Sequence, residues 1–149
     1  MDSGVARFKI ILADDHPFVR RGLRHIIEDT GLYKVCGEAG NGNQTLDLVR
    51  LFHPDVLVTD ISMPPPNGLE VARRLRETLP EVKVLMLSMH DSSEMLRAAA
   101  GAGAFGYVLK SDAEELLPLA LGFLMKGRAF VSPGFDRQLA RELFGAALS

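Results

Sequence analysis

A chain of 149 residues, of which 47% are hydrophobic, has the length and apolar content of one compact domain with its own core. Its formal net charge of −2 argues against a protein that coats nucleic acid or an anionic membrane surface. It has no apolar stretch of about 18 residues, no secretory leader and only one cysteine, so we expect a cytoplasmic protein without a membrane partner.

Strand-like and helix-like segments alternate along the chain. The strand-like runs are short and apolar and cover residues 8–13, 33–39, 55–60, 82–88 and 106–110. The helical patterns that follow them cover residues 17–31, 43–53, 68–80, 92–103 and 111–127. Within the first two helices, we expect Phe18 and Leu51 on the buried faces. Five βα units predict an α/β fold, a doubly wound, five-stranded parallel sheet with helices on both faces.

Two helix starts and one helix interior carry specific signals. Asp91 with Glu94, and Ser111 with Glu114, have the spacing of N-terminal caps with an acidic residue three positions on. Pro118 lies inside the last predicted helix, where it removes a hydrogen bond, so we expect a late start or a kink there.

Residues 128–149 lie beyond the fifth βα unit. Phe135, Leu139 and Leu143 recur every four residues, which predicts a short amphipathic helix. We therefore expect a domain of residues 1–127 followed by a linker that is too short to be a DNA-binding domain.

Polar side chains stand at the predicted C-terminal ends of four of the five strands. Asp14 and Asp15 follow the first strand, and the third, fourth and fifth strands end in Asp60, Ser88 and Lys110. Ligands of open parallel sheets bind at this edge. We therefore expect these side chains to form one site.

The chemistry of this set favours phosphoryl transfer. Three carboxylates repel one another unless a cation lies among them, and oxygen ligands alone favour a hard cation such as Mg²⁺. A lysine ammonium and a serine hydroxyl suit the oxygens of a transferring phosphoryl group. Asp60 stands alone on the central strand and is the candidate nucleophile, while Asp14 and Asp15 are the candidate metal-binding pair. Prolines 64–66 stiffen the loop that follows Asp60.

Four segments carry a resemblance to a known family. They are ADDH (13–16), VLVTDISMPPPNGLE (56–70), VLMLSMHD (84–91) and GYVLKSD (106–112). In order and spacing they resemble the receiver domain of bacterial response regulators, over about residues 8–127. The segments LSMHD and GRAFVSP are similar to those of the NarL/FixJ (LuxR-type) branch. The resemblance implies a flavodoxin-like strand order 2-1-3-4-5 and a phosphorylation-dependent switch rather than a turnover enzyme.

The resemblance also implies roles and partners. Asp60 would accept a phosphoryl group from a sensor histidine kinase. Asp15, Asp60 and the backbone carbonyl of Ser62 would coordinate Mg²⁺, with Asp14 acting through water, and His16 could line the pocket. DNA would be bound only through a helix-turn-helix domain outside this chain, which would control transcription. The alternative is a stand-alone receiver that acts through protein–protein contacts.

Lys110 and Ser88 would hold phosphoryl oxygens, and Tyr107 would be the aromatic residue coupled to Ser88. A packed core role is the alternative for Tyr107. We expect three residues at the opening to tune the lifetime of the phosphorylated state: Ser62, Met89 and His90. Met89 replaces the small residue often found after the serine, and we expect it to shield the phosphoryl group from water.

One peptide bond is left open. Ser111 replaces the proline that often follows the lysine, so the Lys110–Ser111 peptide could be cis or trans.

The Ala- and Gly-rich helix at 92–103 buries little area, and together with Ser88 and Tyr107 it is the expected two-state element. A phosphorylation-dependent homodimer would use either the first and last helices or the face of the fourth and fifth.

Three other functions compete with this interpretation. A haloacid-dehalogenase-like phosphatase carries a second acid two residues after its nucleophile, where this chain has Ser62. A dinucleotide-binding fingerprint opens a helix, whereas GAGAFG (101–106) closes one. A receiver-like module that is never phosphorylated would have lost Asp15, Asp60 or Lys110, and all three are present.

Overall fold

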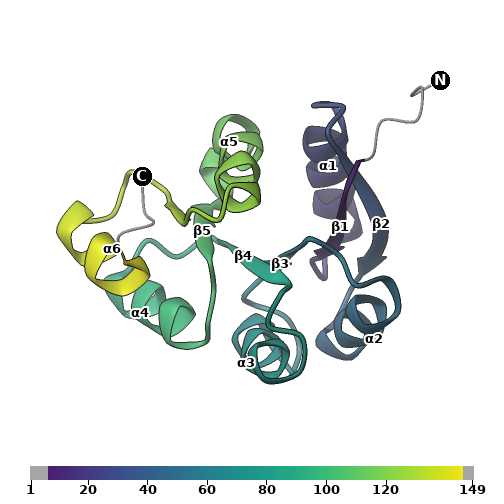
Figure 1. The fold of residues 1–149 in the computed structure, drawn as a ribbon, viewed down its shortest axis with the longest axis horizontal. Helices are drawn as coiled ribbons and strands as arrows, with labels where there is room; N and C mark the ends of the chain where they lie inside the picture. The colour runs from purple at the N-terminus through teal and green to yellow at the C-terminus, as the bar shows by residue number, and fades with distance from the viewer. Residues whose placement is uncertain (1–6, 146–149) are drawn as a thin grey trace.

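A parallel sheet of six strands lies at the centre of the computed structural model, which describes residues 7–145 (Figure 1). The strand order is β2-β1-β3-β4-β5-β6. The bounds are β1 Phe8–Ala13, β2 Tyr33–Ala39, β3 Val56–Asp60, β4 Lys83–Ser88, β5 Gly106–Leu109 and β6 Phe130–Val131. The predicted order of the first five strands is confirmed. The prediction of only five strands is wrong, because a strand of two residues is too short to show an alternating pattern.

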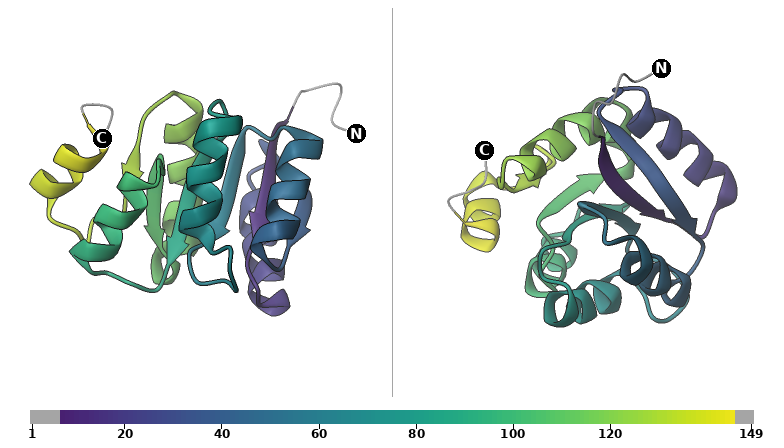
Figure 2. Two further views of the ribbon diagram at one scale, coloured as in Figure 1. Left: turned by 90° about the horizontal axis from the view of Figure 1, so that it is seen from below. Right: turned by 45° about the vertical axis from the view of Figure 1, so that its right-hand side comes forward.

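Helices cover both faces of the sheet. The bounds are α1 Pro17–Glu28, α2 Gly42–Phe52, α3 Gly68–Thr78, α4 Ser93–Gly101, α5 Ala113–Met125 and α6 Arg137–Phe144, with a 3₁₀ turn, η1, at Lys110–Asp112. Figure 1 shows α1 and α5 on one face and α2, α3 and α4 on the other. The helix α6 lies beside α4, as the views in Figure 2 also show. Within the described residues, no helix combines the length and apolarity that a bilayer crossing requires.

Two apolar layers, one on each face of the sheet, form the core. Along β1, Ile10 and Leu12 pack toward α1 and α5, while Ile11 packs in the layer on the opposite face. Side chains alternate between the faces of a strand, so each central strand supplies both layers. This is why the middles of the central strands are apolar and polar side chains stand at or near the strand ends.

Two predicted core residues are exposed. Phe18 is 84% exposed and Leu51 is 72% exposed, so the prediction that they lie on buried faces is wrong. The buried stripe of α1 passes through Leu23 and Ile27, five and nine residues after Phe18. At about 100° per residue, neither Phe18 nor Leu51 falls on its helix's stripe.

Both predicted helix caps are wrong. The N-cap of α4 is Ser92, whose side chain accepts a hydrogen bond from the Met95 amide at 3.2 Å, and not Asp91. The Ser111–Glu114 cap is not formed because residues 110–112 adopt the 3₁₀ turn.

The helix α5 starts at Ala113 and continues through Pro118, so the late start at this proline is not observed. Among the described residues the one cis peptide bond is Pro65–Pro66, so Lys110–Ser111 is trans.

Residues 130–144, the C-terminal segment, pack on the rest of the domain. The strand β6 pairs in parallel with β5, with Gly106 opposite Phe130 and Tyr107 opposite Val131. Phe135 is buried just before α6, and Ala140 is buried within that helix. The division of the chain at residue 127 stays a prediction.

Candidate functional site

Asp14 forms the buried floor of the polar site at the ends of β1 and β3. Its side chain has no exposed surface. Oδ1 accepts a hydrogen bond from the backbone N–H of His16 at 2.9 Å, and Oδ2 accepts one from Nζ of Lys110 at 2.8 Å. The Arg20 guanidinium donates to the Asp14 carbonyl at 2.6 Å, which holds the turn after β1 in place. This carboxylate is therefore fully engaged within the protein.

Asp60 lies at the end of β3 with only 4% of its surface exposed. Its Oδ2 accepts a hydrogen bond from Lys110 at 3.1 Å, and its Oδ1 accepts one from the Ser62 N–H at 3.1 Å. Burial raises the pKa of the Asp60 carboxyl, and the hydrogen bond and charge of Lys110 oppose that rise. The result is a carboxylate that is held in place and poorly solvated, as a nucleophile should be.

Lys110 joins the two carboxylates. It is the first residue of η1, directly after β5, and its Nζ contacts both Asp14 and Asp60. Burial by itself lowers the pKa of this ammonium, but the hydrogen bonds to the two carboxylates outweigh it and the pKa is raised. Lys110 is therefore positively charged in the folded protein.

The loop after Asp60 is fixed at both ends. The Gly68 N–H donates to the carbonyl of Ile61 at 3.0 Å, and Asn67 and Glu70 form a capping box at the start of α3. A Cβ atom at position 68 would overlap the carbonyl oxygen of Asp60, so only glycine allows α3 to start this close to the end of β3. The loop therefore fixes the backbone of Asp60.

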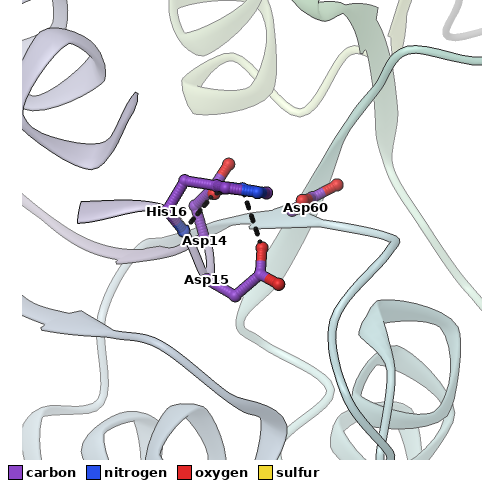
Figure 3. A group of neighbouring side chains, drawn as sticks. All are labelled: Asp14, Asp15, His16 and Asp60. Atoms are coloured by element: carbon purple, nitrogen blue, oxygen red, sulfur yellow. Dashed lines mark hydrogen bonds and ion pairs between the residues drawn. The ribbon is translucent and has the colours of Figure 1, made fainter. Parts of the chain in front are cut away.

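His16 and Asp15 complete the acidic cluster, as Figure 3 shows. Nδ1 of His16 lies 3.1 Å from Oδ1 of Asp14 and 2.9 Å from Oδ1 of Asp15. These three residues and Asp60 each offer one ligand atom, all within 4.8 Å of one another. The Oδ1 atom of Asp15 is buried, and its contact with Nδ1 of His16 does not have hydrogen-bond geometry. Three neighbouring carboxylates, one of which has a buried oxygen that accepts no hydrogen bond, fit a hard divalent cation.

A cleft of about 310 Å³ opens above Asp60. Its lining residues are His16, Asp60, Ser62, Met89, His90 and Lys110. Met89 is 81% exposed and stands at the rim, so it leaves much of the opening uncovered in this conformation. The sequence-predicted residues Asp60, Ser62, Met89, His90 and Lys110 therefore meet in one cleft.

Ser88 lies beneath this opening and does not line it. The residue is 1% exposed, and its Oγ accepts a hydrogen bond from the N–H of His90 at 2.9 Å. Since a hydroxyl oxygen can accept a hydrogen bond while its own proton donates another, Ser88 can also donate, and the Tyr107 phenol lies within its reach.

Tyr107 is fully buried on β5. Its Oη donates to the carbonyl of His90 at 2.6 Å, and burial raises the pKa of its phenol. Its ring meets that of Phe135 edge to face, with centroids 5.2 Å apart. Sequence reasoning missed this partner. The signal available for β6 was an apolar pair, Phe130 and Val131, between the turn-forming Gly127 and the Pro-Gly at 133–134.

Comparison with known proteins assigns the family. The model of the response regulator receiver domain matches residues 10–121. The chain is 33% identical over 136 residues to the transcriptional regulatory protein DegU of Brevibacillus brevis, covering 91% of this chain and 58% of that protein. It is 37% identical over 135 residues to the oxygen regulatory protein NreC of Staphylococcus haemolyticus, covering 90% and 62%. The chain thus spans about three fifths of the length of these curated relatives.

Solved structures agree in fold. A LuxR-family two-component response regulator from Aurantimonas sp. SI85-9A1 has a TM-score of 0.84 and 37% identity, covering 92% of this chain and 98% of that one. A structure of two RcsB dimers bound to two parallel DNAs has a TM-score of 0.82 and 29% identity, covering 91% and 69%. The chain therefore belongs to the response regulator receiver domain family, and it is similar to the receivers of DegU- and NreC-type regulators.

Proposed function

We propose that Asp60 is the phosphoacceptor of this receiver domain and takes its phosphoryl group from a histidine of a sensor kinase. A carboxylate oxygen of Asp60 bonds to phosphorus while the phosphorus–nitrogen bond of the phosphohistidine breaks and its electron pair returns to the imidazole. The observation that carries this proposal is the buried Asp60 carboxylate that shares the Lys110 ammonium with Asp14.

We assign the metal site to Asp15, Asp60 and the backbone carbonyl of Ser62, with Asp14 acting through water. Two observations support the assignment: Oδ1 of Asp15 is buried and accepts no hydrogen bond, and the three carboxylates lie close together. Mg²⁺, when bound, supplies positive charge that offsets these carboxylates and the phosphoryl oxygens.

Two further side chains are assigned to the phosphoryl oxygens. Lys110 is charged and contacts Asp60. When Asp60 is phosphorylated, the ammonium can move its hydrogen bond from the carboxylate to an oxygen of the phosphoryl group. Ser88 supplies its hydroxyl proton. Tyr107 is linked to Ser88 through the backbone of His90. The Tyr107 hydroxyl donates to the His90 carbonyl, and the His90 N–H donates to Oγ of Ser88.

The product is a signal and not a released molecule, since receiver domains are switches rather than turnover enzymes. We propose that hydrolysis of the acyl phosphate ends the signal, and that its rate is tuned at the rim of the cleft by Ser62, Met89 and His90. A phosphatase of the haloacid-dehalogenase type is not favoured, because the family match covers residues 10–121.

For the output, we propose control of transcription through a DNA-binding domain outside this chain. DegU is a transcriptional regulatory protein, and the RcsB structure contains dimers on DNA. We also propose that phosphorylation promotes a homodimer. Residues 1–127 would then act as the receiver and residues 128–149 as the connection to the output.

The test is phosphorylation of the whole chain with Mg²⁺ and a small acyl-phosphate donor, followed by intact-mass measurement. We expect one added phosphoryl group in the unaltered protein and none in Asp60→Asn. Asp47→Asn is the matched control, because Asp47 is an exposed carboxylate on α2. Unchanged phosphorylation of Asp60→Asn would rule out the assignment, and multiple turnover of phosphate esters would favour the phosphatase instead.

A further inference from the structure

The C-terminal segment, defined as residues 130–144, reaches the candidate site through one aromatic contact. We propose that Phe135 is a positioning residue for this site, and that docking of the C-terminal segment is coupled to occupancy of Asp60 through Tyr107 and the backbone of His90. The inference rests on the proposed function of Asp60 and adds an element that senses its phosphorylation.

Hydrogen bonds attach the start of the C-terminal segment to β5. The Ser132 N–H donates to the Tyr107 carbonyl at 2.9 Å, and the Leu109 N–H donates to Oγ of Ser132 at 3.0 Å. Ser132 has no exposed surface, so this attachment is shielded from water. The Arg137 guanidinium donates to the carbonyls of Val131 and Ser132 at 3.2 Å. The segment is therefore tied to β5 at the position of Tyr107.

Side-chain packing extends this attachment from Tyr107 to α4. The rings of Phe135 and Tyr107 meet at 84°, the edge-to-face arrangement that aromatic quadrupoles prefer. Phe135 is 6% exposed and Tyr107 is fully buried. Two residues further on, α6 begins and packs against α4, with Ala140 completely buried. A movement of the Tyr107 ring would therefore disturb the packing of the C-terminal segment on β5.

Two hydrogen bonds connect Tyr107 to the site. Its Oη donates to the His90 carbonyl at 2.6 Å, and the His90 N–H donates to Oγ of Ser88 at 2.9 Å. With one lone pair of Oγ engaged in this way, the Ser88 hydroxyl can still donate, either to the Tyr107 phenol beside it or to a phosphoryl oxygen. The docked segment therefore holds Ser88 in an arrangement that suits an occupied site.

The sign of the coupling follows from this arrangement. If the docked segment favours an occupied Asp60, occupancy must favour docking to the same extent, because coupling between two equilibria is reciprocal. Loosening Phe135 should weaken binding of a phosphoryl mimic, and binding of the mimic should protect the C-terminal segment.

The decisive comparison uses two matched substitutions in the 149-residue chain, with beryllofluoride and Mg²⁺ as the phosphoryl mimic. Phe135→Leu removes the contact with Tyr107. Phe52→Leu is the control, since Phe52 also packs against the core layer that contains Phe135 but lies at the end of α2, outside the C-terminal segment. We expect the apparent affinity for the mimic to fall at least about fivefold in Phe135→Leu and to change less than about twofold in Phe52→Leu. Equal affinities in the two variants, or tighter binding in Phe135→Leu, would overturn the inference.

A second measurement does not depend on altering the packing of the segment. Amide exchange across residues 130–144 should slow when the unaltered protein binds the mimic. Tyr107→Phe keeps the ring and removes Oη, so occupancy should no longer protect the segment in that variant. Unchanged exchange in the unaltered protein would contradict the coupling alone. Failure of the mimic to bind the unaltered protein would instead contradict the proposed function, and the coupling with it.

Discussion

Lys110 and Asp14 lie 96 positions apart in the chain, yet the Lys110 ammonium is 2.8 Å from Oδ2 of Asp14. The same ammonium is 3.1 Å from Asp60. One lysine therefore compensates two carboxylates, both of which are nearly or fully buried. The charge balance of the site depends on this residue in the absence of phosphorylation.

Lys110→Met should therefore destabilise the protein. Removing one member of a buried ion pair leaves uncompensated charge, at a cost of about 3 kcal/mol near neutral pH. We expect urea unfolding at pH 7 to show this loss and acidic pH to reduce it, because the carboxyls then become protonated. Lys126→Met is the control, since Lys126 is exposed and forms no ion pair among residues 7–145. A loss of equal size in both variants would contradict the charge argument.

Asp60→Asn should have the opposite effect on stability. Burial raises the pKa of the Asp60 carboxyl in the folded protein, so the folded state binds this proton more tightly than the unfolded chain. The stability due to this group is present at acidic pH and is lost as pH rises through the raised pKa. We expect Asp60→Asn to be more stable at pH 7 by about 1 kcal/mol, or about 3 °C in melting temperature.

The pH profile provides the check on that prediction. The gain in Asp60→Asn should disappear as the pH falls through the raised pKa of Asp60, where the native carboxyl is also neutral. Asp47→Asn should show no gain at any pH, because Asp47 is 79% exposed at its side chain. Saturating Mg²⁺ should narrow the difference by stabilising the unaltered protein.

Gly68→Ala should displace Asp60. The added Cβ would overlap the Asp60 carbonyl, and overpacking against backbone costs about 1–3 kcal/mol. We expect lower stability in thermal unfolding and slower phosphorylation by the acyl-phosphate donor. Gly122→Ala is the matched control, because a Cβ there meets nothing within 4 Å and lies inside α5. It should be neutral or stabilising by about 0.5–1 kcal/mol. Normal phosphorylation of Gly68→Ala would show that the loop does not position Asp60.

Met89→Ala should shorten the lifetime of the acyl phosphate. Met89 stands at the rim of the cleft, and its flexible side chain can fold over the opening when the site is occupied. Because the side chain is 81% exposed in this conformation, we expect only about a twofold faster decay, equivalent to about 0.4 kcal/mol in the barrier. The decay of purified phosphoprotein measures it, with Leu51→Ala as a control of similar exposure. An equal or slower decay would remove the shielding argument.

The location of the site was predictable because the C-terminal ends of parallel strands meet at one edge. Asp14, Asp60 and Lys110 could be placed there from the strand pattern alone, and the structure brings them into contact. The hydrogen bond that engages Ser88 was not predictable, because it depends on the path of the backbone at His90. The cap of α4 was misassigned for a similar reason, since Asp91 and Ser92 are both good caps and only backbone geometry selects between them.

The contact between Tyr107 and Phe135 lay beyond sequence reasoning for a different reason. The two rings belong to segments with no shared periodicity, and β6, which brings the C-terminal segment beside β5, has only two residues. The regular spacing of Phe135, Leu139 and Leu143 indicated a helix, but the structure places Phe135 before α6, in contact with the sheet. Tertiary contacts of this kind override a local pattern.

The pairing of β6 with β5 also decides which chain lengths are safe to study. Phe130 and Val131 cover the outer side of Gly106 and Tyr107 on β5. A chain trimmed after Gly127 would turn β5 into an open edge strand, with unpaired backbone groups beside an uncovered aromatic ring. Such edges pair with other molecules and promote aggregation. Self-association of the trimmed chain would then result from the exposed edge of β5 and would not reflect the phosphorylation state.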